Sequence, residues 1–250
     1  TRYGRRIHPS RSGGANLLVD EPQPVALLGP APDVVLHDEP QPPLLRGWLH
    51  LVAFVVSVPA GILVIAAATS TRARVGAIIY AVAVTTLFAV SSTYHRRVWT
   101  PDGRRRMRRL DHGTIFVMIA GCYTPLCLLA MTGPASGGLL VAAWVGAAIG
   151  LGLAVTGLAE KPVFGLACYI SLGWIFVLAL PQLSHQISLV DVVLLACGGL
   201  VYTGGAVVLG TNRPNPFPGV FGYHEVWHTL VVVACVCHYI VIYSMVHGAP

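Results

Sequence analysis

Long apolar runs separated by short polar segments dominate the chain from residue 47 onward. A helix needs roughly 20 apolar residues to cross the hydrocarbon core of a bilayer. Membrane strands are excluded because the runs are too long and lack alternation of polar and apolar positions. The pattern therefore predicts seven membrane-spanning helices, over residues 47–69, 75–94, 111–131, 139–158, 163–180, 189–209 and 223–246.

The connections between these runs are short, which predicts a single all-α bundle of a polytopic integral membrane protein. Residues 1–45 differ from the rest, because they hold many prolines, scattered charges and few aromatic residues. Such a composition cannot bury a core and is typical of a disordered segment. We therefore expect a proline-rich cytoplasmic tail over residues 1–45 and a seven-helix membrane domain over residues 46–250.

The overall composition agrees with a membrane protein. Hydrophobic residues make up 55% of the chain and charged residues 10%, whereas a soluble domain usually carries about 25% charged residues. These values exclude an ordinary soluble fold and a disordered protein. A net charge of +6 would suggest nucleic acid in a soluble chain, but here it serves better as a signal of membrane orientation, and we expect no nucleic-acid partner.

The basic residues predict that orientation. Seven arginines fall within residues 95–111, between the second and third runs, and positive loops stay in the cytoplasm. With seven spans, the amino terminus is then cytoplasmic and the carboxyl terminus lies outside. Of the 16 basic residues, Arg72 and Arg74 fall on the outer side and the others on the inner side. We expect a multi-pass protein of the plasma membrane, and lipid head-group binding by the arginines is compatible with this topology.

Ionisable residues inside apolar spans are costly and mark candidate functional sites. The seventh run begins with His224, Glu225 and His228, in the pattern HExxH. The two histidines are four residues apart, so they share one helix face and both can reach one tetrahedral zinc ion. In zinc peptidases with this pattern the glutamate is the general base. Alternatively, Glu225 pairs with an arginine of the 95–111 segment. We favour this pairing because Asp111, at the start of the third run, already supplies a carboxylate at the same depth.

A second group closes the second run, where Ser91 and His95 are again four residues apart, and Asp111 opens the third run. By itself, His95 fits an interfacial histidine and Asp111 fits a helix N-cap beside positive charge. The alternating direction of the spans, however, brings His95, Asp111 and the two histidines of the seventh run to one membrane depth. Three histidines and a water molecule form the open coordination of a catalytic zinc site. A neighbouring carboxylate and hydroxyl suit the surroundings of that water.

His238 lies ten residues beyond His228, about 15 Å further along the helix, and is therefore too far away to share the metal. Two interpretations remain, a hydrogen-bonded core histidine or a residue of a polar cavity.

Several motifs together strongly resemble the bacterial haemolysin III family, which is related to the adiponectin and progestin receptors. The resemblance covers about residues 49–246. The motifs are Ser91-x-x-x-His95, Arg109-Leu-Asp111-His112, Ile119-Ala-Gly-Cys-Tyr123-Thr124-Pro125, Phe221-Gly-x-His224-Glu225-x-x-His228 and Cys237-His238.

This resemblance implies a seven-helix bundle with a cytoplasmic amino terminus and a zinc site near the cytoplasmic face. By the family pattern, His95, His224 and His228 are the zinc ligands, and Asp111 and Ser91 contact the water on the zinc ion. Relatives include enzymes that cleave the amide of ceramides, so the resemblance favours a lipid hydrolase.

The sequence leaves four functions to compare. The first is a zinc-dependent hydrolase acting on a lipid amide or ester, and the second is a non-catalytic membrane lipid sensor or regulator with a structural zinc ion. Both have membrane lipids as partners. A pore-forming haemolysin is disfavoured because no run carries a polar stripe that could line a channel. An intramembrane protease needs an aspartate deep in another span, whereas Asp191 is expected near the outer end of the sixth run.

Overall fold

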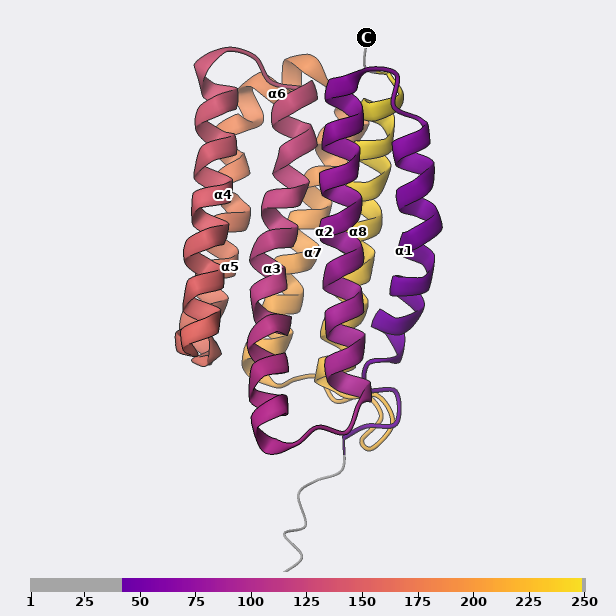
Figure 1. The fold of residues 1–250 in the computed structure, drawn as a ribbon, viewed down its shortest axis with the longest axis vertical. Coiled ribbons are helices and arrows are strands. Elements are labelled where there is room, and N and C mark those ends of the chain that lie inside the picture. The colour runs from indigo at the N-terminus through magenta and orange to yellow at the C-terminus, as the bar shows by residue number, and fades with distance from the viewer. Residues whose placement is uncertain (1–41, 249–250) are drawn as a thin grey trace, which may run out of the picture. The chain divides into compact units, whose positions relative to one another are not determined.

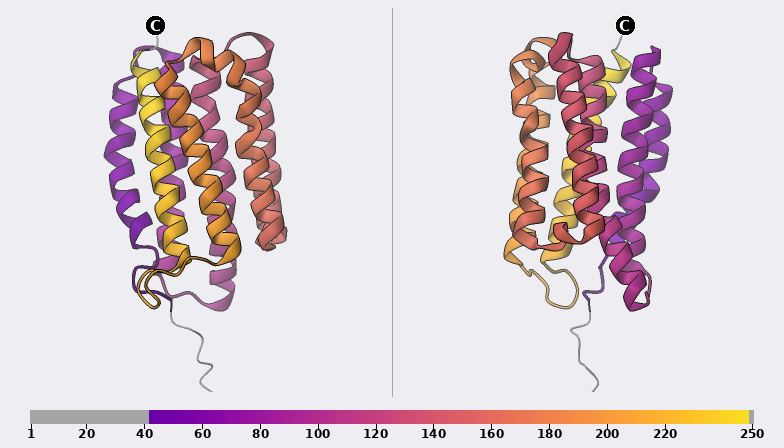
Figure 2. Two further views of the ribbon diagram at one scale, coloured as in Figure 1. Left: turned by 180° about the vertical axis from the view of Figure 1, so that it is seen from behind. Right: turned by 60° about the vertical axis from the view of Figure 1, so that its left-hand side comes forward.

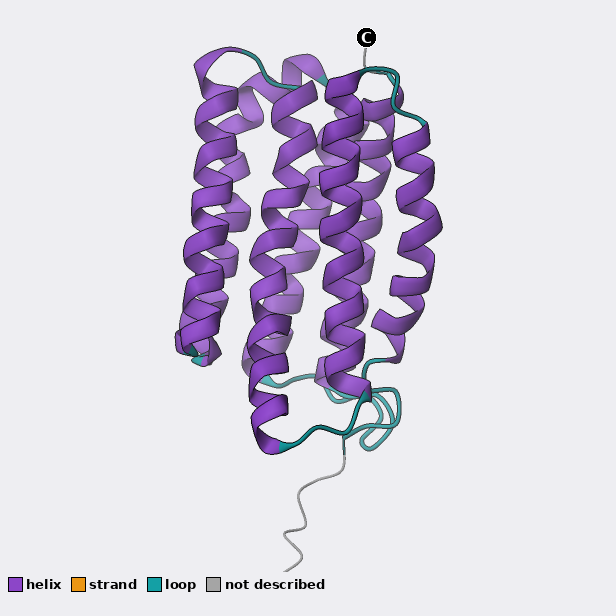
Figure 3. Cartoon of the chain, in the orientation of Figure 1, coloured by secondary structure: helices purple, strands orange, loops and turns teal. Residues whose placement is uncertain are grey.

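The computed structural model describes residues 42–248, which form helices joined by short loops (Figures 1 and 3). Seven helical segments are long and apolar enough to cross a membrane, which confirms the predicted all-α, seven-span fold. The described part contains no strand beyond one isolated bridge, between Phe217 and Phe221. The elements are α1 (Trp48–Ala66), α2 (Thr71–Arg96), α3 (Pro101–Leu129), α4 (Gly133–Thr156), η1 (Leu158–Glu160), α5 (Pro162–Trp174), η2 (Ile175–Ala179), α6 (Leu180–Gln186), α7 (Leu189–Thr211) and α8 (Tyr223–His247).

The fifth span is interrupted within the membrane. It consists of α5, the 3-10 segment η2 and α6, and it extends to Gln186, six residues beyond the predicted end. Backbone groups freed by such an interruption need partners because lipid supplies none. The buried Tyr123 of α3 provides them, since its hydroxyl accepts the Phe176 N–H at 2.7 Å and donates to the Gly173 carbonyl at 2.7 Å.

The segment between the second and third spans corrects a prediction. Residues 95–111 were expected to form a loop, but α3 already begins at Pro101, so five of the seven arginines lie in α3. The physical reasons are a cap by Thr100, whose hydroxyl accepts the Gly103 N–H at 3.2 Å, and proline at the first helical position. Arginine is also a good helix former. Two of the arginines, Arg108 and Arg109, pair with Glu160 of η1.

Helix α8 packs against α1, α2, α3 and α7, so its residues face several neighbours at once. Figure 2 shows that the start of α8 lies at the same end of the bundle as the end of α2 and the start of α3. We call this the arginine end, defined by the arginines of residues 96–109. The membrane side that it faces stays a prediction.

Of the predicted amino-terminal tail, residues 1–41 lie outside the described residues. The part that follows is attached to the bundle. The Leu44 N–H donates to the Gly219 carbonyl at 3.0 Å, and the Leu45 N–H donates to the Val220 carbonyl at 3.2 Å. The segment before α1 is therefore tied to the loop that leads into α8.

Candidate metal centre

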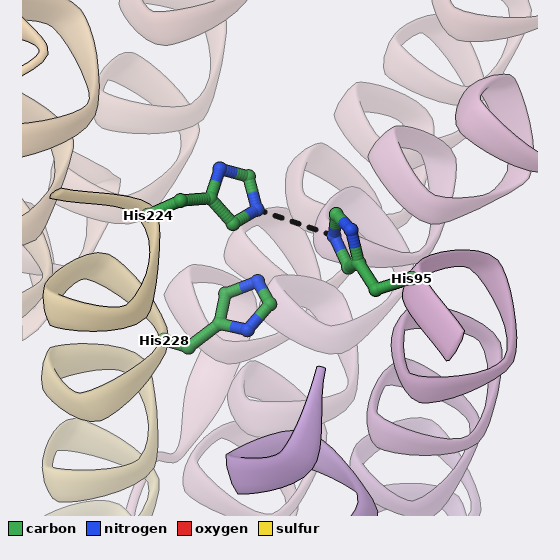
Figure 4. A group of neighbouring side chains, drawn as sticks. All are labelled: His95, His224 and His228. Carbon is green, nitrogen blue, oxygen red and sulfur yellow. Dashed lines mark hydrogen bonds between the residues drawn. The ribbon is translucent and has the colours of Figure 1, made fainter. Parts of the chain in front are cut away.

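Three histidines meet at the arginine end of the bundle (Figure 4). His95 comes from the last turn of α2, and His224 and His228 come from the first two turns of α8. One ring nitrogen of each lies within 4.8 Å of the other two. His224 Nε2 lies 3.2 Å from His95 Nε2. The structure thus brings together the three histidines that the sequence singled out.

The donor set fits a zinc ion. Two nitrogens that bind one tetrahedral zinc ion at about 2.0–2.1 Å lie about 3.3 Å apart, close to the 3.2 Å between His95 and His224. The ring of His228 is buried. Neutral imidazoles in a desolvated setting suit a divalent metal of the first transition row.

Asp111 and Ser91 lie beside the histidine cluster. Asp111 Oδ2 lies 3.7 Å from His95 Nε2, and the side chains are 13% and 8% exposed, respectively. Ser91 is buried one turn before His95 on α2. Ser91 and Asp111 line the same cavity. A carboxylate and a hydroxyl therefore face the same small space as the imidazoles.

A fourth histidine, His50 of α1, also reaches this space, and the sequence analysis missed it. Its ring stacks on His228 with centroids 3.7 Å apart and an interplanar angle of 9°. Its Nδ1 is hydrogen-bonded to Ser91 Oγ at 2.8 Å. The sequence did contain a signal for His50. It is an ionisable residue near the start of the first apolar run, at the same predicted membrane depth as His95.

Glu225, the central residue of the HExxH pattern, does not face a free space. Arg46 Nε donates to Glu225 Oε1 at 2.5 Å, and the Gly222 N–H donates to Glu225 Oε2 at 2.8 Å. The glutamate side chain is 1% exposed. Pairing with an arginine is thus confirmed, but the partner is Arg46 before α1, not an arginine of residues 95–111. The reason is proximity, because the segment before α1 lies against the loop before α8.

The alternative interpretation of Glu225, as a general base, has no support in this geometry. Both carboxylate oxygens hold the start of α8, because one accepts from Arg46 and the other accepts the Gly222 N–H, for which the helix backbone offers no carbonyl acceptor. Asn215 completes this arrangement, since its Oδ1 accepts the Tyr223 N–H at 2.9 Å. These contacts fix the helix turn that carries His224.

A cavity of about 420 Å³ extends from the histidine cluster into the bundle. Its wall at the arginine end includes His50, Ser91, Asp111, His224 and His228. Its other walls come from α3, α5, α7 and α8 and are mostly aliphatic and aromatic. The volume lies within the range of about 300–1,000 Å³ that is typical of small-molecule sites, and the apolar walls suit a hydrocarbon chain.

Of the two interpretations of His238, the structure supports a residue of the cavity. The side chain lines its wall, and Nδ1 makes no hydrogen bond with the residues that the structure describes. His112, next to Asp111, lines the cavity as well. Asp191 lies at the opposite end of the bundle, where its N–H donates to the hydroxyl of Ser188, the N-cap of α7, so Asp191 does not reach the cluster.

Comparisons with known proteins agree with this fold. A sequence profile described as "Haemolysin-III related" matches residues 39–239. Hemolysin-3 of Bacillus cereus is 29% identical over 193 residues, which cover 73% of this chain and 82% of that protein. The monocyte to macrophage differentiation factor of Homo sapiens is 27% identical over 181 residues, covering 71% of this chain and 73% of that protein. The Hemolysin-3 homolog of Bacillus subtilis (strain 168) is 26% identical over 186 residues, covering 73% and 84%.

Proposed function

Because the chain belongs to the haemolysin III family, we propose that this multi-pass membrane protein is a zinc-dependent hydrolase of a lipid amide or ester. The observation that carries the proposal is the convergence of three imidazoles, two of which, His224 and His228, line one end of a largely apolar cavity. A site that only stabilised the fold would need no such cavity. A hydrolase of lipids needs both a polar reaction centre and room for a hydrocarbon chain.

In this proposal His95, His224 and His228 hold the zinc ion. When bound, zinc supplies a Lewis acid that polarises a carbonyl group and makes a water molecule more acidic. The chain's own contribution begins with the ligand geometry, because two of the three histidines lie on successive turns of α8. The start of that helix is held by Arg46 and Glu225.

In this proposal Asp111 transfers the proton of the attacking water, and Ser91 supplies hydrogen bonds. Asp111 accepts a proton from the attacking water, whose oxygen forms a bond to the carbonyl carbon of the lipid. The carbon–nitrogen or carbon–oxygen bond then breaks, and Asp111 returns the proton to the leaving amine or alcohol. Ser91, next to Asp111, orients the water or the carbonyl oxygen through its hydroxyl.

The proposed orientation of the protein in the membrane follows from the distribution of its basic residues. The arginine end faces the cytoplasm under the positive-inside rule, so the zinc site lies near the cytoplasmic face. The lipid is drawn from the surrounding membrane, with its chain in the apolar part of the cavity and its amide or ester at the histidines. We assign the protein to the cell membrane on the same grounds.

Metal analysis of the purified full-length protein tests the site. We expect about one zinc ion per chain, and the double change His224→Ala with His228→Ala abolishes it. His185→Ala is the matched control, because this exposed histidine lies on α6 at the opposite end of the bundle. A wild-type protein without metal overturns the site assignment.

Turnover is tested separately with a panel of labelled ceramides and phospholipids. We expect hydrolysis of at least one lipid class, and Asp111→Asn lowers the rate at least about 100-fold while zinc stays bound. A protein that binds zinc but cleaves no lipid contradicts the hydrolase. That result favours the second function weighed above, a non-catalytic lipid sensor with a structural zinc ion.

A further inference from the structure

His50 touches two residues of the proposed zinc centre, although it belongs to neither HExxH nor the Ser91–His95 pair. Among the described residues of α1, it is the one that lines the cavity. We infer that His50 is a positioning residue, which fixes the direction of the Ser91 hydroxyl and the plane of the His228 imidazole. The inference rests on the proposed function above and adds a role that the three ligands and Asp111 do not fill.

The ring of His50 is held on three sides. Nδ1 is hydrogen-bonded to Ser91 Oγ at 2.8 Å. One face stacks on His228 at 3.7 Å, and the edge of the ring meets Phe88 with centroids 5.1 Å apart and an interplanar angle of 64°. With 3% of its surface exposed, His50 has little freedom to rotate. A side chain fixed in this way can impose its orientation on its neighbours.

The same geometry excludes His50 as a fourth ligand. The lone pair of an imidazole nitrogen lies in the ring plane, and two stacked rings present their faces, not their lone pairs, to each other. His50 is also absent from the group whose ligand atoms lie within 4.8 Å of one another. Its contact with the centre is therefore indirect, through His228 and Ser91.

The start of α1 is built to bring His50 to this position. Gly47, which precedes the helix, has φ 77°, a conformation that favours glycine. A Cβ atom at Gly47 would lie 2.8 Å from the Cβ atom of His95. Helix α1 is thus docked directly against one proposed ligand, and His50 follows one turn later beside another.

Two consequences follow for the chemistry. Whichever tautomer His50 adopts, it engages one side of Ser91 Oγ, so the other side of the hydroxyl is directed toward Asp111 and the reacting groups. The flat stack on His228 prevents that ring from turning about its bond to the helix. Residues that orient metal ligands in this manner are worth about 10- to 100-fold in metal affinity or activity.

Three variants separate the two contacts. His50→Phe keeps a flat ring for the stack but removes the hydrogen bond. His50→Asn places a polar atom near the position of Nδ1 but removes the ring, and His50→Ala removes both. Each full-length variant is loaded with Co²⁺, and its visible absorption spectrum, metal dissociation constant and kcat and KM for a cleaved lipid are measured together with its Tm.

For His50→Phe we expect the Co²⁺ spectrum and the metal dissociation constant of the wild type, with kcat lowered about 10- to 100-fold. For His50→Asn we expect kcat within about fivefold of the wild type, a changed Co²⁺ spectrum and about 10-fold weaker metal binding. In a Ser91→Ala background, His50→Phe has no further effect on kcat, because the two changes remove the same hydrogen bond.

The inference is overturned if all three variants retain the wild-type spectrum and affinity, or if they all lose both in proportion to a loss of Tm. Metal content and lipid turnover of the wild-type protein test the proposed function independently. Without bound metal, it overturns the site and this inference together. With bound Co²⁺ but without turnover, it contradicts the hydrolase alone, and His50 is then judged by the contrast in spectrum and affinity between the Phe and Asn variants.

Discussion

Arg46 and Glu225 are 179 residues apart in the sequence, yet they form an ion pair of 2.5 Å beside the histidine cluster. The glutamate is almost completely buried, whereas the arginine keeps about a quarter of its side chain exposed, at 23%. The pair joins the segment before α1 to the first turn of α8. It therefore stabilises the element that presents His224 and His228.

Removal of the arginine is expected to cost more than removal of the glutamate charge. Arg46→Met leaves a carboxylate buried without its cation, for which a loss of about 3–5 kcal/mol in the free energy of unfolding is typical. Glu225→Gln leaves a partly exposed guanidinium and costs about 1–3 kcal/mol. Unfolding in detergent measures both, with Arg105→Met as a control in an exposed pair with Asp102, worth less than about 1 kcal/mol. Equal losses for the two changes would contradict this asymmetry.

The same glutamate distinguishes this centre from that of a zinc peptidase. Because both of its oxygens are engaged, Glu225→Gln is expected to keep lipid turnover within about 10-fold of the wild type. A general base contributes about 10²–10⁴-fold to the rate, so a loss of that size at unchanged metal content would assign the base to Glu225.

Gly47→Ala tests the docking of α1 against His95. The left-handed conformation costs a non-glycine residue roughly 1–2 kcal/mol, and the added Cβ atom would also collide with the Cβ atom of His95. We expect a loss of more than about 2 kcal/mol together with weaker metal binding, measured by unfolding and metal titration.

Gly133→Ala is the matched control for that change. Gly133 has φ 69°, but no atom lies within 4 Å of the position of an added Cβ. It therefore reports the conformational cost alone and leaves metal affinity unchanged. If the two substitutions have equal effects, the contact between Gly47 and His95 has no energetic importance.

Tyr123→Phe is expected to destabilise the fifth span where its helix is interrupted. The change leaves the Phe176 N–H without its partner in a buried position, which costs about 1–3 kcal/mol. The measurement is unfolding of the purified protein. Tyr243→Phe, at a more exposed position of α8, serves as the control and is expected to change stability by less than about 0.5 kcal/mol.

Labelling of introduced cysteines tests the orientation. Val98→Cys lies in the loop between α2 and α3 at the arginine end, and Ser184→Cys lies at the opposite end. In intact cells, a maleimide that cannot cross membranes is expected to label Ser184→Cys, and to label Val98→Cys after permeabilisation only. Labelling of Val98→Cys in intact cells would reverse the proposed topology.

The spans and the histidine cluster could be predicted from the sequence for related reasons. Apolar runs longer than 18 residues have few alternatives to membrane helices. Once the spans alternate in direction, the depth of each polar residue follows from its position along its run. That argument brought His95, Asp111, His224 and His228 together, and it applies equally to His50, which was missed because no motif drew attention to it.

Other features depend on contacts that local patterns do not contain. The helical start of α3 was predicted as a loop because hydropathy reports where the membrane ends, not where the helix ends. The cap by Thr100 and the pairing with Glu160 extend α3 past that point. The partner of Glu225 could not be chosen from the sequence, because Arg46 and the arginines of residues 95–111 are chemically equivalent until the fold places one of them nearby.

The four clustered histidines occupy positions 50, 95, 224 and 228, so the centre draws on α1, α2 and α8. A chain that leaves the ribosome from its amino terminus inserts α1 and α2 long before α8 exists. Until α8 is inserted, His95 lacks both of the other proposed ligands. For the proposed zinc site, metal loading then has to follow the insertion of α8, and any fragment that stops before residue 223 lacks two of the three proposed ligands.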